Sequence, residues 1–236
     1  MLPPNVEMVV PVFCTAILSS SFFWIMVLLD KTMEKRVSVY SRVAISHVII
    51  FFIILVVLYL LPGRLAEWGV NLGHCQTSLT LGVILGLTIG VVFSLFSHGT
   101  NITHWSVTGV ITQLKDKQNL VHLLSQIFLI GLSEELFFRG LLVTYLMKQY
   151  SVNLIGLHIA VIIVSVMFAS VHFYKLLLGA KFGKILPFVI GGFFYGLVLG
   201  WLYQETGSLI GPVALHNLGN SCMFLISIGI PKQIQA

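Results

Sequence analysis

The stretch QIFLIGLSEELFFRGLLVTYLM, residues 126–147, decides how this chain must fold. It is long and apolar enough to cross a bilayer, which takes about 20 residues of helix, yet it holds Glu134, Glu135 and Arg139 near its middle. A charged side chain at bilayer depth costs at least roughly 2.5–3.5 kcal/mol. These three side chains must therefore face the interior of the protein, where partners or a watery cavity stabilise them.

The spacing of these charges separates the two glutamates. Glu135 and Arg139 lie four residues apart, the helical interval at which a glutamate that precedes a cation can pair with it. We interpret this pair as mainly structural. Glu134 projects about 100° away around the helix, and we interpret it as a chemically active carboxyl rather than a spare group beside an ion pair.

The composition of the whole chain is that of a membrane protein. Of its 236 residues, 57% are hydrophobic and 9% are charged, and the mean hydropathy is +1.00, whereas a soluble domain carries about 25% charged residues. A soluble fold is excluded. The net charge of +5 is small and dispersed, so no nucleic-acid partner is expected. Cys14, Cys75 and Cys222 are too widely spaced for a disulfide framework or a Cys-x-x-Cys metal site.

Apolar stretches bounded by charges predict an all-α membrane protein, a bundle of seven transmembrane helices that forms a single domain over residues 1–236. A mildly apolar piece around Trp105–Ile111 predicts a short interfacial helix, so an eighth element is compatible with the pattern. The seven predicted spans are Val9–Leu29, Val43–Leu61, Leu79–Ser97, Leu124–Met147, Ile155–Leu178, Ile185–Tyr203 and Leu209–Ile230.

Lysine and arginine predict the orientation, because basic loops stay on the cytoplasmic side. With seven crossings, ten basic residues fall on one side and only Arg64 and Lys148 on the other. We therefore predict a plasma-membrane protein with its amino terminus outside and its carboxyl terminus in the cytoplasm. The ten residues are Lys31, Lys35, Arg36, Arg42, Lys115, Lys117, Lys175, Lys181, Lys184 and Lys232.

Two histidines also lie where a membrane span is expected: His172 in SVMFASVHFYKLLL and His216 in GPVALHNLGNSCMFL. A lone membrane histidine is often only hydrogen-bonded to a neighbouring helix. Asn220 follows His216 by four residues, so both side chains share one helical face and present two donors to one region. Convergence of these groups with Glu134 is compatible with the spacing but not required by it. The other histidines, His47 among them, are interpreted as solvated, interfacial or packing groups.

Three short motifs, each inside a predicted span, follow one another along the chain: Glu134-Glu135-x-x-x-Arg139, Phe168-x-x-x-His172 and His216-x-x-x-Asn220. Together they resemble the signature of the type II CAAX prenyl protease and bacteriocin-processing family, also called the abortive-infection family. The resemblance covers roughly residues 126–223. It implies an intramembrane glutamate-dependent protease with a catalytic core of about residues 119–230 and a cavity that opens toward the cytoplasm and the bilayer.

Carried over position by position, the resemblance implies that Glu134 is the general base that activates a water molecule, which His172 helps to hold. His216 and Asn220 would form the oxyanion hole, and the adjacent Glu135–Arg139 pair would orient the site. Peptide hydrolysis needs such a base, a bound water and a donor pair. No cofactor or metal is expected. The implied substrate is a membrane-associated or lipidated peptide in the lipid bilayer, and a prenylated carboxyl-terminal CAAX peptide is one candidate.

Two other interpretations stay open. In a zinc peptidase, Glu134, His172 and His216 would bind the metal, because two histidines and a carboxylate are adequate zinc ligands. The chain has no His-Glu-x-x-His element, however, and Asn220 would then have no role. A non-catalytic membrane scaffold, immunity protein or transporter would instead use the same polar cluster as a binding or proton site.

Overall fold

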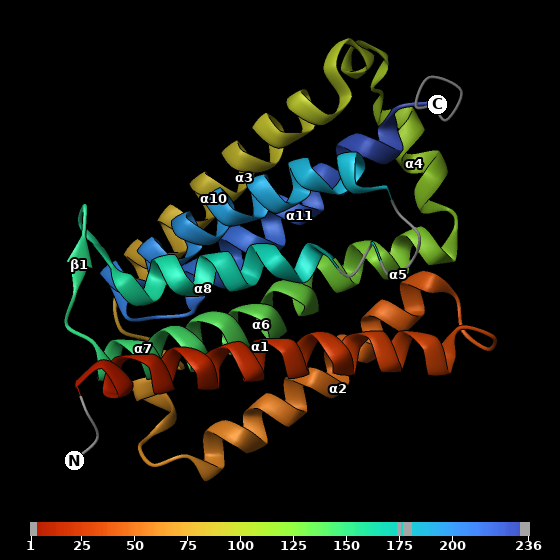
Figure 1. Ribbon diagram of the computed structural model, residues 1–236. Helices are drawn as coiled ribbons and strands as arrows, with labels where there is room; N and C mark the ends of the chain where they lie inside the picture. Colours follow the sequence, from red (N-terminus) through yellow and green to blue (C-terminus); the bar gives the residue numbers. More distant parts are fainter. Residues whose placement is uncertain (1–3, 174–175, 177–180, 232–236) are drawn as a thin grey trace.

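The computed structural model of the protein describes residues 4–173, 176 and 181–231 as a bundle of helices with one short β-hairpin (Figure 1). The α-helices are α1 Pro4–Met33, α2 Val39–Leu60, α3 Cys75–His98, α4 Val107–Leu114, α5 Lys117–Ser125, α6 Gly131–Glu135, α7 Thr144–Gln149, α8 Ile159–Ser170, α10 Phe182–Thr206 and α11 Ile210–Gly229. Shorter or differently wound segments are η1 Leu65–Trp68, η2 Gly99–His104, η3 Gln126–Ile130, η4 Leu136–Val143 and η5 Val171–Phe173, and the strands are β1 Asn153–Leu154 and β2 Leu157–His158.

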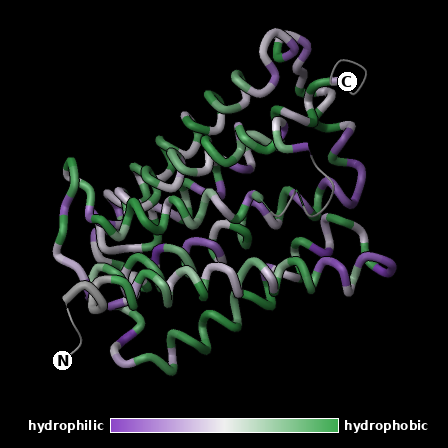
Figure 2. Tube along the Cα trace, viewed as in Figure 1, coloured by the Kyte–Doolittle hydropathy of each residue, from purple (hydrophilic) through white to green (hydrophobic). Residues whose placement is uncertain are grey.

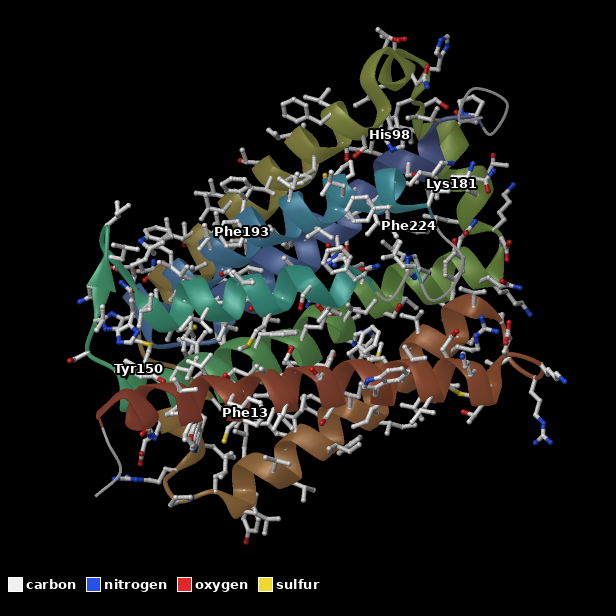
Figure 3. All side chains as sticks on the ribbon, viewed as in Figure 1. Phe13, His98, Tyr150, Lys181, Phe193 and Phe224 are labelled. Atoms are coloured by element: carbon white, nitrogen blue, oxygen red, sulfur yellow. The ribbon has the colours of Figure 1, made fainter. Side chains whose placement is uncertain are left out.

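The outer surface of the bundle is apolar, as a lipid environment requires. Hydrophobic residues dominate the long helices (Figure 2), and large side chains point outward from them, such as Phe13, which is 63% exposed (Figure 3), and Phe96, which is 86% exposed. The chain is therefore an all-α integral membrane protein with one added hairpin. Four helices of the described residues are long and apolar enough to cross a membrane: Val9–Met33, Val39–Leu60, Cys75–His104 and Phe182–Thr206.

The other passes along the bundle are shorter, interrupted or more polar. Helix α8 has 12 residues, and α11 buries His216 and Asn217 along its 20 residues. The segment from α5 to α7 changes its winding and carries the buried Glu135–Arg139 pair. Polar groups held inside a bundle lower the hydropathy of the helices that carry them. The count of seven crossings therefore stays a prediction.

The basic residues gather at one end of the bundle. The first turn of α1 and the last turn of α11 lie at opposite ends (Figure 1). Arg64, just before η1, and Lys148, in the last turn of α7, lie at the end where α1 begins, and Lys175 and Lys232 lie outside the described residues. This asymmetry supports the predicted orientation. The basic residues near the opposite end are Lys31, Lys35, Arg36, Arg42, Lys115, Lys117, Lys181 and Lys184.

Cysteine labelling tests this orientation. Thr32, in the last turn of α1, and Leu72, in the connection between η1 and α3, are both exposed and lie at opposite ends of the bundle. In a background without the native cysteines, an impermeant maleimide applied to intact cells should label Leu72→Cys and spare Thr32→Cys, because only the first faces outward. Both variants should react after permeabilisation, which is the control for access. The opposite pattern in intact cells would reverse the assigned orientation.

The predicted start of the fifth span is wrong by four residues, because a hairpin precedes the helix. Ile155 and Gly156 have φ values of 53° and 79°, the pair of positive values that a two-residue type I′ turn needs. Asn153 pairs with His158 across the two strands. His158 then caps α8, since its Nδ1 accepts a hydrogen bond from the Ala160 N–H at 3.1 Å. The predicted end of this span, Leu178, lies outside the described residues.

The short helix predicted in the third connection is confirmed as α4. Its first turn is capped by Ser106, whose Oγ accepts from the Gly109 N–H at 3.0 Å. Its eight residues span about 12 Å, far less than the roughly 30 Å of a bilayer core. Trp105 anchors the segment by donating its indole N–H to the Leu225 carbonyl at 3.3 Å.

Glycines allow the helices around the site to pack closely against one another. On α10 a stripe of small residues faces α8: a Cβ on Gly196 would lie 3.1 Å from Ser165 Cα. A second stripe lies on α3, where a Cβ on Gly86 would lie 3.0 Å from Leu215 Cα of α11. Such close backbone approach is the usual function of small residues in membrane helices. It holds His216, the next residue of α11, at a defined height in the bundle.

Candidate active site

The helix that carries the two glutamates is continuous from Lys117 to Gln149 and contains two π-helical segments. Residues 126–130 and 136–143 are π-helical, and the glutamates lie in the five-residue α-helical segment between them. π-Helical turns are rare and occur often at functional sites, because the added residue rotates the side chains that follow. The direction in which Glu134 points is therefore set by its neighbours as well as by sequence spacing.

Gly131 lets this segment approach α11 closely. Its N–H donates to Asn217 Oδ1 at 2.8 Å, and a Cβ at this position would lie 2.9 Å from His216 Cβ. Any larger residue would push the glutamates away from α11. Asn217 was not identified from the sequence, which pointed to Asn220 instead. The available signal was that Asn217 directly follows His216 in an apolar span.

The predicted pair of Glu135 and Arg139 is confirmed. Arg139 Nη1 donates to Glu135 Oε1 at 2.9 Å, and the two residues are 0% and 1% exposed. The guanidinium also donates through Nη2 to the Gly196 carbonyl at 3.1 Å and lies 4.7 Å from the centre of the Phe168 ring. These contacts tie the glutamate helix to α10 and α8.

His216 is oriented by Glu135 and by two aromatic rings. Its Nδ1 lies 2.7 Å from Glu135 Oε1. A carboxylate paired with arginine only accepts hydrogen bonds, so Nδ1 must carry a hydrogen, and Nε2 is turned toward Glu134 Oε2 at 3.8 Å. The rings of Phe168 and Tyr195 meet the imidazole edge-on at 5.9 Å and 5.6 Å between centroids. The ring therefore has little freedom to rotate.

His47 of α2 is a site residue that the sequence interpretation missed. It was expected to be a packing or interfacial group near a span end, but α2 already begins at Val39, which carries His47 into the bundle, where it is 3% exposed. Its Nδ1 lies 2.7 Å from Ser133 Oγ and its Nε2 lies 3.9 Å from Glu134 Oε1. The available signal was a histidine inside a stretch that is otherwise apolar.

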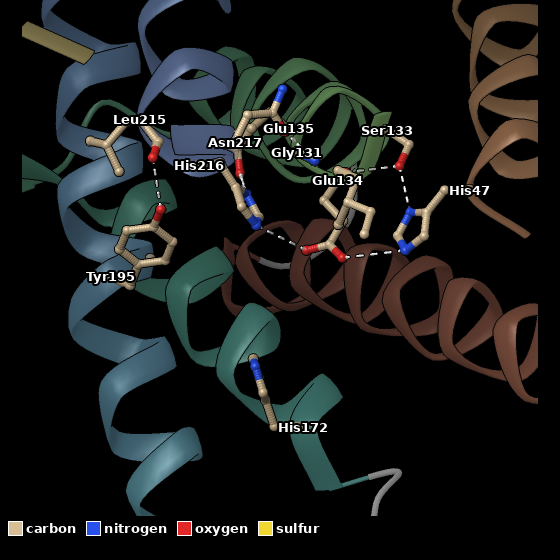
Figure 4. Close-up of polar contacts among 12 residues, drawn as sticks. His47, Gly131, Ser133, Glu134, Glu135, His172, Tyr195, Leu215, His216 and Asn217 are labelled. Atoms are coloured by element: carbon tan, nitrogen blue, oxygen red, sulfur yellow. Dashed lines mark hydrogen bonds and ion pairs between the residues drawn. The ribbon is translucent and has the colours of Figure 1, made fainter. Parts of the chain in front are cut away.

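Glu134 consequently lies between two imidazoles (Figure 4). Its two carboxyl oxygens face His47 Nε2 at 3.9 Å and His216 Nε2 at 3.8 Å. These gaps are too long for direct hydrogen bonds and have the size that one bridging water spans. The Glu134 side chain keeps 22% of its surface exposed, whereas that of Glu135 has none. Only the first glutamate is accessible for chemistry.

The contacts described for His172 and Asn220 do not include Glu134. His172 lies on η5, with its Nδ1 3.3 Å from the Ala169 carbonyl and its ring 6.0 Å from Phe168, and Figure 4 shows it below Glu134 on the neighbouring helix. Phe168 is thus packed between the rings of His172 and His216. Asn220 is half-buried on α11, one turn after His216, and in the described part of the chain its side chain makes no hydrogen bond.

The residues of the zinc alternative are not arranged as a ligand set. Glu134 and His216 are neighbours, whereas the ring of His172 contacts Phe168 and packs against Gly192 of α10. Across residues 4–173, 176 and 181–231, no group of three or more His, Cys, Asp or Glu side chains is placed to hold a metal ion. The three cysteines are free.

Fold and site together define an integral membrane protein with a partly exposed carboxylate between two imidazoles, an arrangement suited to hydrolysis. Residues 116–222 match the Rce1-like family, described as type II CAAX prenyl endopeptidase Rce1-like. The matched segment, a little under half of the chain, is similar to a family of intramembrane CAAX-type endopeptidases, which supports a peptidase function at the level of that family. The match runs from α5 into α11 and leaves α1–α4 outside. No curated protein and no solved structure matches the chain.

Proposed function

We propose that the protein hydrolyses a peptide bond near the carboxyl terminus of a prenylated, membrane-associated substrate, with Glu134 as the general base. The observation that carries this proposal is the position of the Glu134 carboxylate between His47 Nε2 and His216 Nε2, at 3.9 and 3.8 Å. A water molecule in either gap lies within proton-transfer distance of the carboxylate. Glu135, its neighbour, is fully engaged with Arg139 and His216 and serves to orient the site.

In this mechanism Glu134 takes a proton from the water while the water oxygen attacks the carbonyl carbon of the scissile bond. The carbonyl electron pair moves to its oxygen, and hydrogen-bond donors stabilise that negative charge. The tetrahedral intermediate then collapses: the C–N bond breaks, and Glu134 returns the proton to the leaving nitrogen. The products are a carboxylic acid and an amine, and Glu134 is restored without a cofactor.

Asn220 is assigned as an oxyanion donor. It lies one turn after His216 on the same face of α11, and its amide can donate without a change of protonation. His216 would complete the donor pair when both of its ring nitrogens carry hydrogen. His172 is assigned to the substrate side of Glu134, since Phe168 connects its ring to that of His216.

A groove beside His172 supports a lipidated substrate. It has a volume of about 420 Å³ and lies between α1 and the end of α8. Aromatic side chains form part of its wall, and Val171 and Phe173 flank His172 directly. A prenyl chain bound there would place the peptide next to the proposed base. The lining residues are Ser19, Ser20, Phe23, Trp24, Ser170, Val171, Phe173 and Leu176.

The match to a peptidase family favours hydrolysis over the scaffold, immunity or transport functions that the same polar cluster permits.

The test of the proposed function uses a pair of internally quenched peptides that end in a CAAX sequence and are identical except that one is farnesylated. In lipid nanodiscs the protein should cleave the farnesylated peptide after the modified cysteine, at least about tenfold faster than its partner, because remote binding energy positions the scissile bond. Prolonged chelation should leave the rate unchanged. Cleavage of neither peptide, or activity lost on chelation and restored by zinc, would contradict the proposal.

Asn220→Ala tests the oxyanion assignment. Loss of one oxyanion donor costs roughly 10²–10³ in kcat, and KM should change little because the donor acts mainly in the transition state. Steady-state kinetics on the farnesylated peptide measure both values. Asn153→Ala, in the exposed strand β1, is the matched control and should behave as wild type. Near-normal turnover of Asn220→Ala would remove this residue from the mechanism.

A further inference from the structure

We propose that His47 is a second protein ligand of the attacking water, accepting a hydrogen bond at Nε2, and that Ser133 holds the ring in the tautomer this requires. The inference rests on the proposed function and extends it to α2. Helix α2 lies outside the segment that matches the CAAX protease family. The catalytic site is then completed by the amino-terminal part of the chain.

The tautomer of His47 follows from the contacts of Ser133. The Ser133 hydroxyl has one hydrogen, and its Oγ lies 3.0 Å from the Ile130 carbonyl oxygen, which only accepts. The hydroxyl therefore donates to Ile130. With the hydroxyl hydrogen directed to Ile130, we assign the ring as the donor in the 2.7 Å contact between His47 Nδ1 and Ser133 Oγ. In the neutral imidazole this leaves the hydrogen on Nδ1 and a lone pair on Nε2.

That lone pair faces Glu134. His47 Nε2 and Glu134 Oε1 are 3.9 Å apart, and two acceptors cannot bond to each other directly. A water molecule has two hydrogens and can donate one to the carboxylate and one to the imidazole. Held in this way, its remaining lone pair is directed away from both groups and is available to attack a carbonyl carbon.

Helix α2 is held rigidly enough for this role. His47 belongs to a buried stripe of α2 that continues through Ile50, Ile54 and Leu58. At the start of the helix, Arg42 Nε donates to Asp30 Oδ1 of α1 at 2.8 Å. A side chain with packed neighbours and a fixed hydrogen bond can position a water within the narrow range that catalysis needs.

Two substitutions separate this role from mere packing. The amide of His47→Asn reaches the place of Nδ1 and keeps the contact with Ser133 but puts nothing at Nε2. The amide of His47→Gln reaches the place of Nε2. If His47 holds the water, His47→Asn should lose at least about tenfold in kcat with little change in KM, and His47→Gln should stay within about threefold of wild type. His104→Asn, at an exposed position, is the control, and thermal unfolding checks that each variant is folded.

A purely structural histidine would give the opposite order, with the asparagine variant tolerated and the glutamine variant impaired, and that result would overturn the proposal. Glu134→Gln is measured beside these variants. If Glu134→Gln is inactive while His47→Asn is normal, the proposed function stands and the role of His47 falls.

Nitrogen-15 NMR of histidine-labelled protein tests the tautomer without any substrate. The His47 signal is assigned by its loss in His47→Gln. In the wild type it should show hydrogen on Nδ1 and none on Nε2, and Ser133→Ala should shift it toward the Nε2–H form. Hydrogen on Nε2 in the wild type would overturn the proposal whatever the activity measurements give.

Discussion

Glu134→Gln should lower kcat by roughly 10²-fold or more, because an amide keeps the shape of the carboxylate but cannot take the proton of the attacking water. Substrate affinity should be largely kept, since the amide still fills the space between His47 and His216. The measurement is turnover of the farnesylated CAAX peptide by purified, folded protein, with binding of the same peptide followed by fluorescence anisotropy.

The control for this loss is Glu34→Gln, an exposed glutamate in the connection between α1 and α2. It removes the same charge outside the bundle and should leave both turnover and binding unchanged. Near-normal turnover by folded Glu134→Gln would show that another group activates the water. The adjacent carboxylate of Glu135 is a poor substitute, because its Oε1 already accepts from Arg139 and His216.

Arg139→Gln should reduce the free energy of unfolding by about 3–5 kcal/mol, the range for removing one partner of a buried ion pair. The glutamine leaves the Glu135 carboxylate charged, 0% exposed and without its cation. It also removes the donor to the Gly196 carbonyl and the cation over the Phe168 ring. Denaturant unfolding in detergent, followed by tryptophan fluorescence, measures the change.

The double variant Glu135→Gln/Arg139→Gln separates charge from packing. It leaves no buried charge behind. Its loss in free energy of unfolding should therefore be clearly smaller than the sum of the losses in the two single variants. Lys148→Gln is the matched control, since Lys148 forms an exposed pair with Glu67 at 3.5 Å and should change stability little. Additive single and double losses would mean that the two buried side chains contribute independently.

Membrane character and the Glu135–Arg139 pair could be predicted because each is a local property. Whether a segment of about 20 apolar residues can cross a bilayer depends on that segment alone, and helical geometry brings residues four apart to one face. The short helix after Trp105 was predicted on the same basis. The turn at Ile155–Gly156 was missed, since a positive φ at isoleucine is uncommon and apolar residues continue into α8.

The candidate site was predicted only where its residues lie on one helix or in a recognisable motif. Glu134, Glu135 and Arg139 lie on one stretch of helix, and His216 was noted as a histidine in an apolar span whose role the resemblance then implied. His47 and Asn217 were missed because their partners, Glu134 and Gly131, belong to distant helices. The roles of His172 and Asn220 stay predictions, as do the seven crossings and the orientation.

The sequence by itself determined that this chain lies in a membrane and must bury two glutamates and an arginine, because lipid cannot solvate charge. It also determined that Glu135 takes Arg139 as its partner, since that contact needs only one helix. The tertiary structure alone decided which groups surround Glu134. A π-helical segment on each side of the glutamates changes the winding of their helix, and Gly131 allows α11 to pack closely against it. Helix α2 brings His47 to the other carboxyl oxygen of Glu134. These contacts depend on the packing of separate helices, which no spacing along one helix specifies.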